Sequence, residues 1–321
     1  MEGAFGKYLS SPLFTFTVGA NKKEVIVHSS PLAGLSQSLN TLMTGEMIEA
    51  KTRHVDWSEV DLDTFARLCE FAYLRNYTPP SFRLIDDKSP SIKVTETVKE
   101  KKKCKKRRSN VNWGDLIPEP VLEPEPVFEP EPVLEPEPEP ELEAPPDGAP
   151  KSDSPPEVAF CDDPEIPYRE RSVWTGHLRD AFKESLVVPS PQSGDLDYTF
   201  TPPENTASWE DFTPVFLDQA RLYVLADKYG IESLCQLVLS KLHQTLKNFK
   251  LYDTGVCGII EFVRFVYSNT PTYGNKIDAM RNFVTRYVVS VLGQIGENKY
   301  FQELLEEGGP FAYDFWQIIW C

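Results

Sequence analysis

The sequence predicts an α+β fold that a long insert interrupts and that an all-helical part follows. Segments near the N-terminus alternate apolar and polar residues as half-buried strands do, and apolar residues in the last third recur at helical spacing. Most of the 28 prolines lie between Pro79 and Pro214, where too little apolar surface exists to offset the conformational entropy of folding. The foldable material is therefore one domain in two pieces, or two small domains.

The first elements indicate a β-hairpin and a third strand. Residues 13–19 alternate apolar and hydroxyl side chains, and residues 20–23 are typical of a turn. Residues 24–28 then indicate the returning strand, and residues 54–57 have the pattern of a third short strand. These segments predict a small sheet near the N-terminus.

Two helices are expected beside these strands. Ser29 or Ser30 is expected to cap the first one, with Pro31 at its first position and Gly45 at its end. The apolar face of this helix consists of leucines three or four residues apart: Leu32, Leu35, Leu39 and Leu42. Asp61 is expected to cap the second helix. Its apolar face contains Phe65, Leu68, Cys69 and Ala72.

The middle of the chain loses all periodicity from about residue 80. Residues 99–108 form a basic block, and residues 119–143 are built on Glu-Pro-Val-Leu-Glu-Pro-Glu-Pro, with Phe128 in place of one leucine. Closely spaced prolines prevent a helix and like charges repel one another, so an extended, disordered spacer is expected. A short helix is expected further on, over residues 173–187.

Helical periodicity returns at Pro214. The first helix there is expected to end at Tyr229, with Gly230 in the left-handed position that follows many helices, and the second begins at Ile231. Three more helices and a short aromatic tail complete the chain: residues 256–267, 277–292 and 300–306, then 313–320.

Particular residues accompany this order of elements. Those in the first part are Phe16-Thr17-Val18-Gly19, Val25-Ile26-Val27-His28-Ser29-Ser30-Pro31-Leu32, Val60-Asp61-Leu62-Asp63-Thr64-Phe65 and Phe71-Ala72-Tyr73. Those in the second part are Leu225-Ala226-Asp227-Lys228-Tyr229-Gly230-Ile231-Glu232-Ser233-Leu234. With them, residues 13–77 resemble the first half of a BTB/POZ domain and residues 220–242 its second half. The resemblance is closest to the fungal BTB proteins, which commonly carry a charged insert here.

The resemblance implies a small three-stranded sheet packed on helices, and a role in protein–protein contact rather than catalysis. It divides the chain into a first BTB half, a disordered insert, a partly ordered linker, a second BTB half and a helical extension: residues 1–80, 81–165, 166–213, 214–248 and 249–321. Many BTB domains form homodimers through an extra N-terminal strand and helix. Few residues precede the first strand here, so the resemblance leaves homodimerisation open.

One local feature is a candidate partner-binding site. In BTB domains that recruit cullin scaffolds, a hydrophobic-x-acidic triplet lies in this region, and Met47-Ile48-Glu49 matches it. An exposed apolar side chain beside a carboxylate suits an interaction hot spot. The alternative is an ordinary loop that packs on the sheet.

The composition excludes several classes of function. A net charge of −16 argues against general affinity for nucleic acid or anionic membranes, and no apolar run is long enough to span a membrane. The absence of a Cys-x-x-Cys pair argues against a zinc site, and no phosphate-binding loop or hydrolase motif is present. We expect no enzyme activity, no cofactor and no small-molecule substrate. Without an apolar signal region, we expect the nucleus or the cytoplasm and not secretion.

The basic block allows three interpretations. It is a candidate nuclear-import signal, a solvated linker attracted to the acidic repeat, or a nucleic-acid contact, of which the last is not expected because no binding motif accompanies it. The candidate residues are Lys101, Lys102, Lys103, Lys105, Lys106, Arg107 and Arg108. The sequence thus favours a BTB-type adaptor, with a substrate adaptor of a cullin-type ubiquitin ligase as its most specific form. The alternative is a nuclear regulator or scaffold that acts through its charged insert.

Replacing the basic residues of residues 101–108 by alanine should move a fluorescently tagged chain from the nucleus to the cytoplasm, because import needs only an exposed cationic peptide. Microscopy of tagged variants measures this, and pull-down of partners should be unaffected. Replacing Lys22 and Lys23 in the first hairpin is the control. A tagged chain that stays nuclear without the basic block would contradict the import interpretation.

Overall fold

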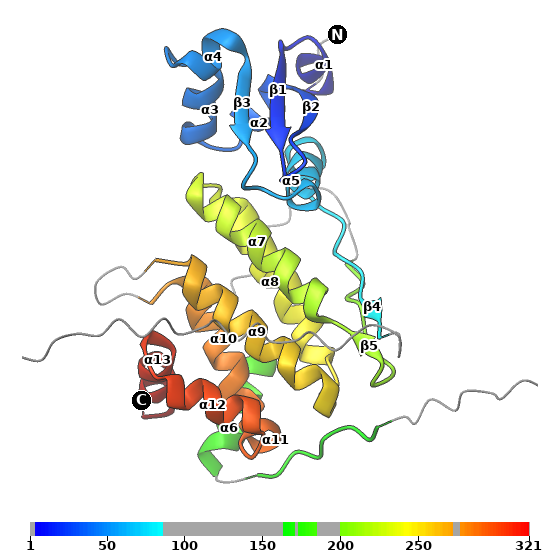
Figure 1. Ribbon diagram of the computed structural model, residues 1–321, viewed down its shortest axis with the longest axis vertical. Coiled ribbons are helices and arrows are strands. Elements are labelled where there is room, and N and C mark those ends of the chain that lie inside the picture. The colour runs from blue at the N-terminus through cyan, green and yellow to red at the C-terminus, as the bar shows by residue number, and fades with distance from the viewer. Residues whose placement is uncertain (1–3, 86–162, 171–172, 185–199, 272–276, 321) are drawn as a thin grey trace, which may run out of the picture. The chain divides into compact units, whose positions relative to one another are not determined.

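A small mixed sheet and many helices make up the described part of the chain, as the predicted α+β class requires (Figure 1). The computed structural model describes residues 4–85, 163–170, 173–184, 200–271 and 277–320. One compact unit contains the described residues on both sides of the insert. This arrangement agrees with one domain in two pieces rather than with two small domains.

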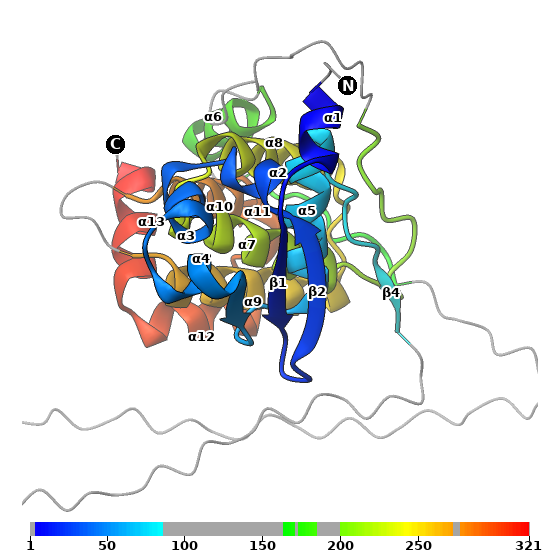
Figure 2. The ribbon, with the colours of Figure 1, turned by 90° about the horizontal axis from the view of Figure 1, so that it is seen from above.

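The sheet contains β1 (Leu13–Val18), β2 (Lys23–His28) and β3 (His54–Trp57) in the order β2-β1-β3. β1 pairs antiparallel with β2 and parallel with β3. Figure 2 shows the β1–β2 hairpin with α5 beside it, and the rings of Phe16 and Phe65 contact each other there with centroids 4.9 Å apart. The predicted hairpin and the predicted third strand are therefore confirmed.

Five helices accompany this sheet in the described N-terminal part: α1 (Ala4–Leu9), α2 (Ser29–Ala33), α3 (Gln37–Thr44), α4 (Ile48–Thr52) and α5 (Leu62–Leu74). The cap predicted for α5 is confirmed, because the Asp61 carboxylate accepts a hydrogen bond from the backbone N–H of Thr64 at 2.8 Å. The sequence pattern did not predict α1 or α4.

The single helix predicted between Ser29 and Gly45 is wrong, because the structure has two. The hydroxyl of Ser36 accepts a hydrogen bond from the backbone N–H of Leu39 at 3.2 Å and so starts α3 as a new helix. Capping of α2 by a serine is also wrong, since its N-cap is His28, whose side chain makes no capping bond. The leucine spacing continues across this break and conceals it.

A two-stranded ribbon joins the two sides of the insert. β4 (Arg83–Leu84) pairs antiparallel with β5 (Glu210–Asp211). The backbone N–H of Ile85 donates to the carbonyl of Trp209 at 2.8 Å, and that of Asp163 donates to the hydroxyl of Ser208 at 3.2 Å. Residues 85 and 163, which flank residues 86–162, are thus bonded to neighbouring positions of the chain.

The remaining described elements are helices. They are α6 (Val173–Lys183), α7 (Thr213–Lys228), α8 (Glu232–Asn248), α9 (Asp253–Asn269), α10 (Ala279–Ser290), α11 (Leu292–Ile295), α12 (Lys299–Glu307) and α13 (Pro310–Trp320). Gly230 follows α7 with a φ of +66°, and the N–H of Ile231 reaches back to the carbonyl of Ala226 at 2.8 Å, as predicted for a left-handed cap. The predicted aromatic tail is wrong, because residues 310–320 form the helix α13.

The segment before α6 is held against the C-terminal helices. The N–H of Ile166 donates to the carbonyl of Leu251 at 2.9 Å, and the side-chain amide of Gln294 donates to the carbonyl of Ile166 at 2.7 Å. The N–H of Arg169 donates to the carbonyl of Gly293 at 3.1 Å. A Cβ at position 293 would lie 2.4 Å from the carbonyl oxygen of Arg169, so this close approach requires glycine.

A buried polar seam joins the parts of the chain on the two sides of the insert. We use the name polar seam for Asn76, Tyr77, Gln219 and Lys241. The Tyr77 hydroxyl donates to the Gln219 side-chain oxygen at 3.0 Å, and the Lys241 ammonium donates to the Asn76 side-chain oxygen at 2.6 Å and to the carbonyl of Tyr77. The same ammonium lies 4.0 Å from the centre of the Tyr77 ring.

Burial lowers the pKa of Lys241 to about 8, while the Glu70 carboxylate acts in the opposite direction. Lys241 is 3 % exposed. In the unfolded chain the same ammonium keeps its proton up to about pH 10.5. Between these two values the unfolded chain binds more protons than the folded one, so the contribution of Lys241 to stability rises with pH.

Deleting residues 90–159 should change the thermal unfolding midpoint only slightly. The ends of the insert are already held close together, and shortening a loop recovers at most about 2 kcal/mol of closure entropy. Scanning calorimetry measures the midpoint. Deletion of residues 86–209, which also removes α6 and the segment packed on Gly293, is the contrast and should lower it. A collapse of stability in the shorter deletion would contradict the single-unit fold.

Replacing Lys241 by methionine should make the stability difference from the wild type depend on pH. The free energy of unfolding of the wild type should rise relative to the variant by roughly 1 kcal/mol per pH unit between about pH 8 and 10.5. Urea titrations over this range measure it, with replacement at the exposed Lys23 as control. A difference that stays constant with pH would contradict the assigned cause.

Candidate functional site

The turn between α3 and α4 places the predicted triplet on the surface. α3 ends at Gly45, as predicted, and the N–H of Gly45 donates to the carbonyl of Thr41 at 2.9 Å. A Cβ at Gly45 would lie 2.5 Å from that same carbonyl oxygen, so glycine permits the turn. Met47 then stands at the N-cap position of α4, and Ile48 and Glu49 lie in its first turn.

The three residues differ in exposure. Met47 and Ile48 are 56 % and 67 % exposed, which is high for large apolar side chains. Glu49 is half-buried, and one of its carboxylate oxygens is buried without a hydrogen-bond partner among the described residues. We name Met47, Ile48 and Glu49 the α4 patch. α4 itself lies against the strand β3, while the side chains of Met47 and Ile48 are exposed.

The packing of α4 does not explain why Met47 and Ile48 are apolar. None of its residues is buried, and it ends after one turn at Arg53, which adopts a left-handed φ of 53°. It lies against α3 and β3. The α4 patch is therefore an exposed apolar pair beside an acidic group, held in place by a glycine turn and a short helix.

The other predicted site residues cannot be placed. The basic block of residues 101–108 lies outside the described residues. Among the cysteines with helical apolar neighbours, Cys235 is buried and Cys69 partly so, and burial raises the pKa of each thiol to about 12. Cys257 is exposed.

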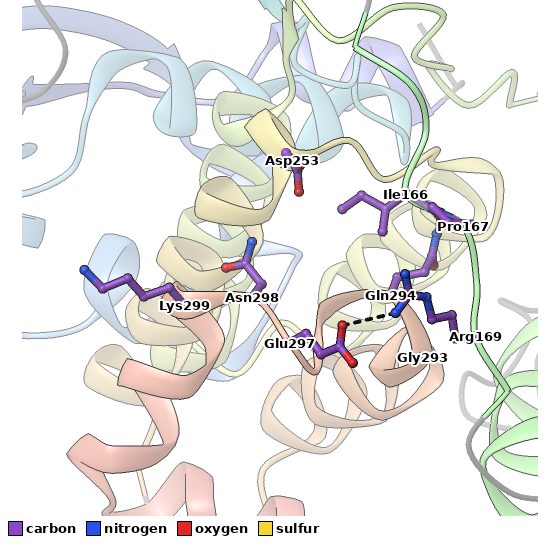
Figure 3. Close-up of a pocket in the computed structure, with 9 residues that line it drawn as sticks. All are labelled: Ile166, Pro167, Arg169, Asp253, Gly293, Gln294, Glu297, Asn298 and Lys299. Atoms are coloured by element: carbon purple, nitrogen blue, oxygen red, sulfur yellow. Dashed lines mark hydrogen bonds and ion pairs between the residues drawn. The ribbon is translucent and has the colours of Figure 1, made fainter. Parts of the chain in front are cut away.

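A cavity of about 350 Å³ opens between the segment before α6 and the helices α9, α11 and α12 (Figure 3). The polar groups around it serve the fold. Arg169 and Glu297 form an ion pair at 3.2 Å, and the Asn298 side chain accepts a hydrogen bond from the N–H of Tyr300 to cap α12. Asp253 lies in the first turn of α9, where a negative charge is favourable. No nucleophile beside a base lines this cavity among the described residues, so it carries no catalytic hypothesis.

The sequence pattern missed an exposed aromatic surface on α13. Trp316 and Trp320 are largely exposed and stack on each other, with ring centroids 5.6 Å apart, and Tyr313 is exposed one turn earlier. The sequence could have predicted this surface from the spacing of the three residues, because separations of three and four residues place all of them on one face of a helix. Phe311, Phe315 and Ile318 form the buried face of the same helix.

No family model, no curated protein and no solved structure matches the chain. Within the described ranges, no three His, Cys, Asp or Glu side chains gather as metal ligands would. The helices that the structure describes include none with both the length and the apolar character needed to cross a membrane. The geometry of the described residues is therefore the basis for a functional proposal.

Proposed function

We propose that the chain is a BTB-type adaptor that binds a partner protein through the α4 patch. The observation that carries the proposal is the exposure of Met47 and Ile48 beside Glu49 at the position where the resemblance expects a partner-binding triplet. An adjacent pair of exposed apolar side chains supplies the kind of anchor that an interface buries at its centre. The surface of α4 is otherwise small and polar.

The arrangement of elements supports the BTB resemblance. A hairpin, short helices, a third strand parallel to the first and the helix α5 follow one another, and the helix pair α7–α8 completes the same compact unit after the insert. The sequence Leu225 to Leu234 spans the turn between α7 and α8, where Gly230 allows the left-handed cap. This order matches what the resemblance implies for a BTB domain divided by an insert.

The specific form of the proposal is recruitment of a cullin scaffold. In that form Met47 supplies the apolar anchor and Glu49 the acidic group. Glu49 is half-buried and lies in the first turn of α4, directly after the two exposed apolar side chains. The general form requires only that some partner covers the α4 patch.

Replacing Met47 and Glu49 together by alanine should reduce recovery of a cullin scaffold at least tenfold in affinity purification followed by mass spectrometry. Loss of a central apolar anchor costs about 2 kcal/mol or more in binding. Ile26→Ala is the matched control, because Ile26 is also a largely exposed apolar residue but lies on β2.

Two other outcomes separate the forms of the proposal. Equal recovery of a cullin with the wild type and the double variant would contradict cullin binding through the α4 patch. Partners other than a cullin that are lost only in the double variant would support the general adaptor and reject its cullin form. Unchanged circular dichroism of the variant would show that the fold is intact, as expected for a helix without buried residues.

A further inference from the structure

A groove of about 250 Å³ lies between α6, the end of α8 and α10, and cations line it from two sides. Arg179 and Lys183 belong to α6, while Lys247 and Lys250 come from the last turn of α8 and the residues after it. Glu165 is the one carboxylate among its described lining residues. We name this hollow the basic groove.

The cations of the basic groove are not neutralised within the described part of the chain. No carboxylate there pairs with Arg179, Lys183, Lys247 or Lys250, and the Arg179 guanidinium instead lies 4.0 Å from the centre of the Tyr168 ring. The carbonyl ends of α6 and α8 favour a positive charge and account for Lys183 and Lys247. They do not account for Arg179 and Lys250, so the groove retains an excess of positive charge.

Apolar and hydrogen-bonding groups lie between these cations. Phe182, Leu246, Phe249 and Val291 also line the groove. Tyr287 lines it as well, and its buried hydroxyl has no hydrogen-bond partner among the described residues. A ligand that fits the basic groove therefore contains carboxylates, an apolar side chain and a hydrogen-bond acceptor.

The acidic repeat of the same chain has this composition. Residues 120–125, 126–131 and 132–137 read Pro-Val-Leu-Glu-Pro-Glu, with Phe128 in the middle copy, so each unit sets an apolar pair beside two carboxylates. We propose that one such unit of residues 119–143 binds in the basic groove of its own chain, with glutamates at the cations and the Leu or Phe side chain on the apolar floor.

The connection of the chain permits this binding. The described chain resumes at Asp163, and Glu165 already lines the groove. Residues 144–162 link the repeat to this point and span up to about 60 Å when extended. A tether of this kind gives an effective concentration in the millimolar range, so a weak contact suffices. The basic block of residues 99–108 also attracts the acidic repeat by its charge. It contains no large apolar side chains that the Leu or Phe of the repeat would contact.

Carbodiimide cross-linking of the full-length chain at low salt, followed by peptide mass spectrometry, tests the proposal. Amide links should join glutamates of residues 119–143 to Lys183, Lys247 and Lys250. Raising the salt to about 1 M should reduce them severalfold, because screening weakens exposed charge pairs. Lys247→Gln with Lys250→Gln should reduce the links that remain at Lys183 at least threefold, whereas Lys22→Gln with Lys23→Gln in the exposed hairpin should not.

A second variant isolates the apolar contribution. Replacing Leu122, Phe128 and Leu134 together by serine keeps every charge of the repeat and should also reduce the links at Lys183 at least threefold. Links that persist at the wild-type level in this variant would overturn the proposed binding mode. Repeat glutamates linked only to lysines of residues 99–108, or to no lysine, would overturn the proposal altogether.

Isotope labelling identifies the source of the occupant. An equal mixture of chains grown on nitrogen-14 and nitrogen-15 is cross-linked, and links within one chain should join peptides of the same isotope. Links that join the two isotopes as often as like isotopes would show that a second copy supplies the repeat and would overturn binding within one chain. These readouts do not involve the α4 patch, so they are independent of the proposed adaptor function.

Discussion

The polar seam is the constraint on which the rest of the structure depends, because it joins residues on opposite sides of the insert. The Lys241 ammonium is buried and donates to Asn76 and to the backbone of Tyr77, while the Tyr77 hydroxyl donates to the equally buried Gln219. A buried polar group that loses its partner costs about 1–3 kcal/mol, and a charged one costs more. These buried groups have their partners on the other side of the insert, so a replacement at one of them leaves its partner unpaired while the two sides stay packed.

This coupling explains how the chain accommodates residues 86–162. The β4–β5 ribbon, with the bonds from Ile85 to Trp209 and from Asp163 to Ser208, holds both ends of the insert beside each other. The polar seam and the stacked rings of Phe82 and Phe212 hold the adjoining elements together. The insert therefore leaves and rejoins the fold at one place, and its length adds only a logarithmic entropy term.

The sequence could predict those elements whose apolar residues recur at the spacing of a buried face. Phe14, Phe16 and Val18 alternate as residues of a half-buried strand do, and all three are buried. The break at Ser36 escaped prediction because the leucine spacing continues through it, and only the capping geometry reveals it. The polar seam could not be predicted at all, because nothing local to Tyr77 or Lys241 indicates a partner that distant in the sequence.

The same distinction holds for the sites. The triplet at Met47 could be found from sequence, but its exposure depends on the turn at Gly45 and on the shortness of α4. The cations of the basic groove come from segments on both sides of β5, so no local pattern unites Arg179 with Lys250. The α4 patch contributes nothing to the buried core, whereas Phe182 and Tyr287 belong both to the core and to the floor of the basic groove. The proposed binding at the α4 patch can therefore be tested without loss of stability, whereas at the basic groove only the exposed lysines can be replaced without disturbing the core.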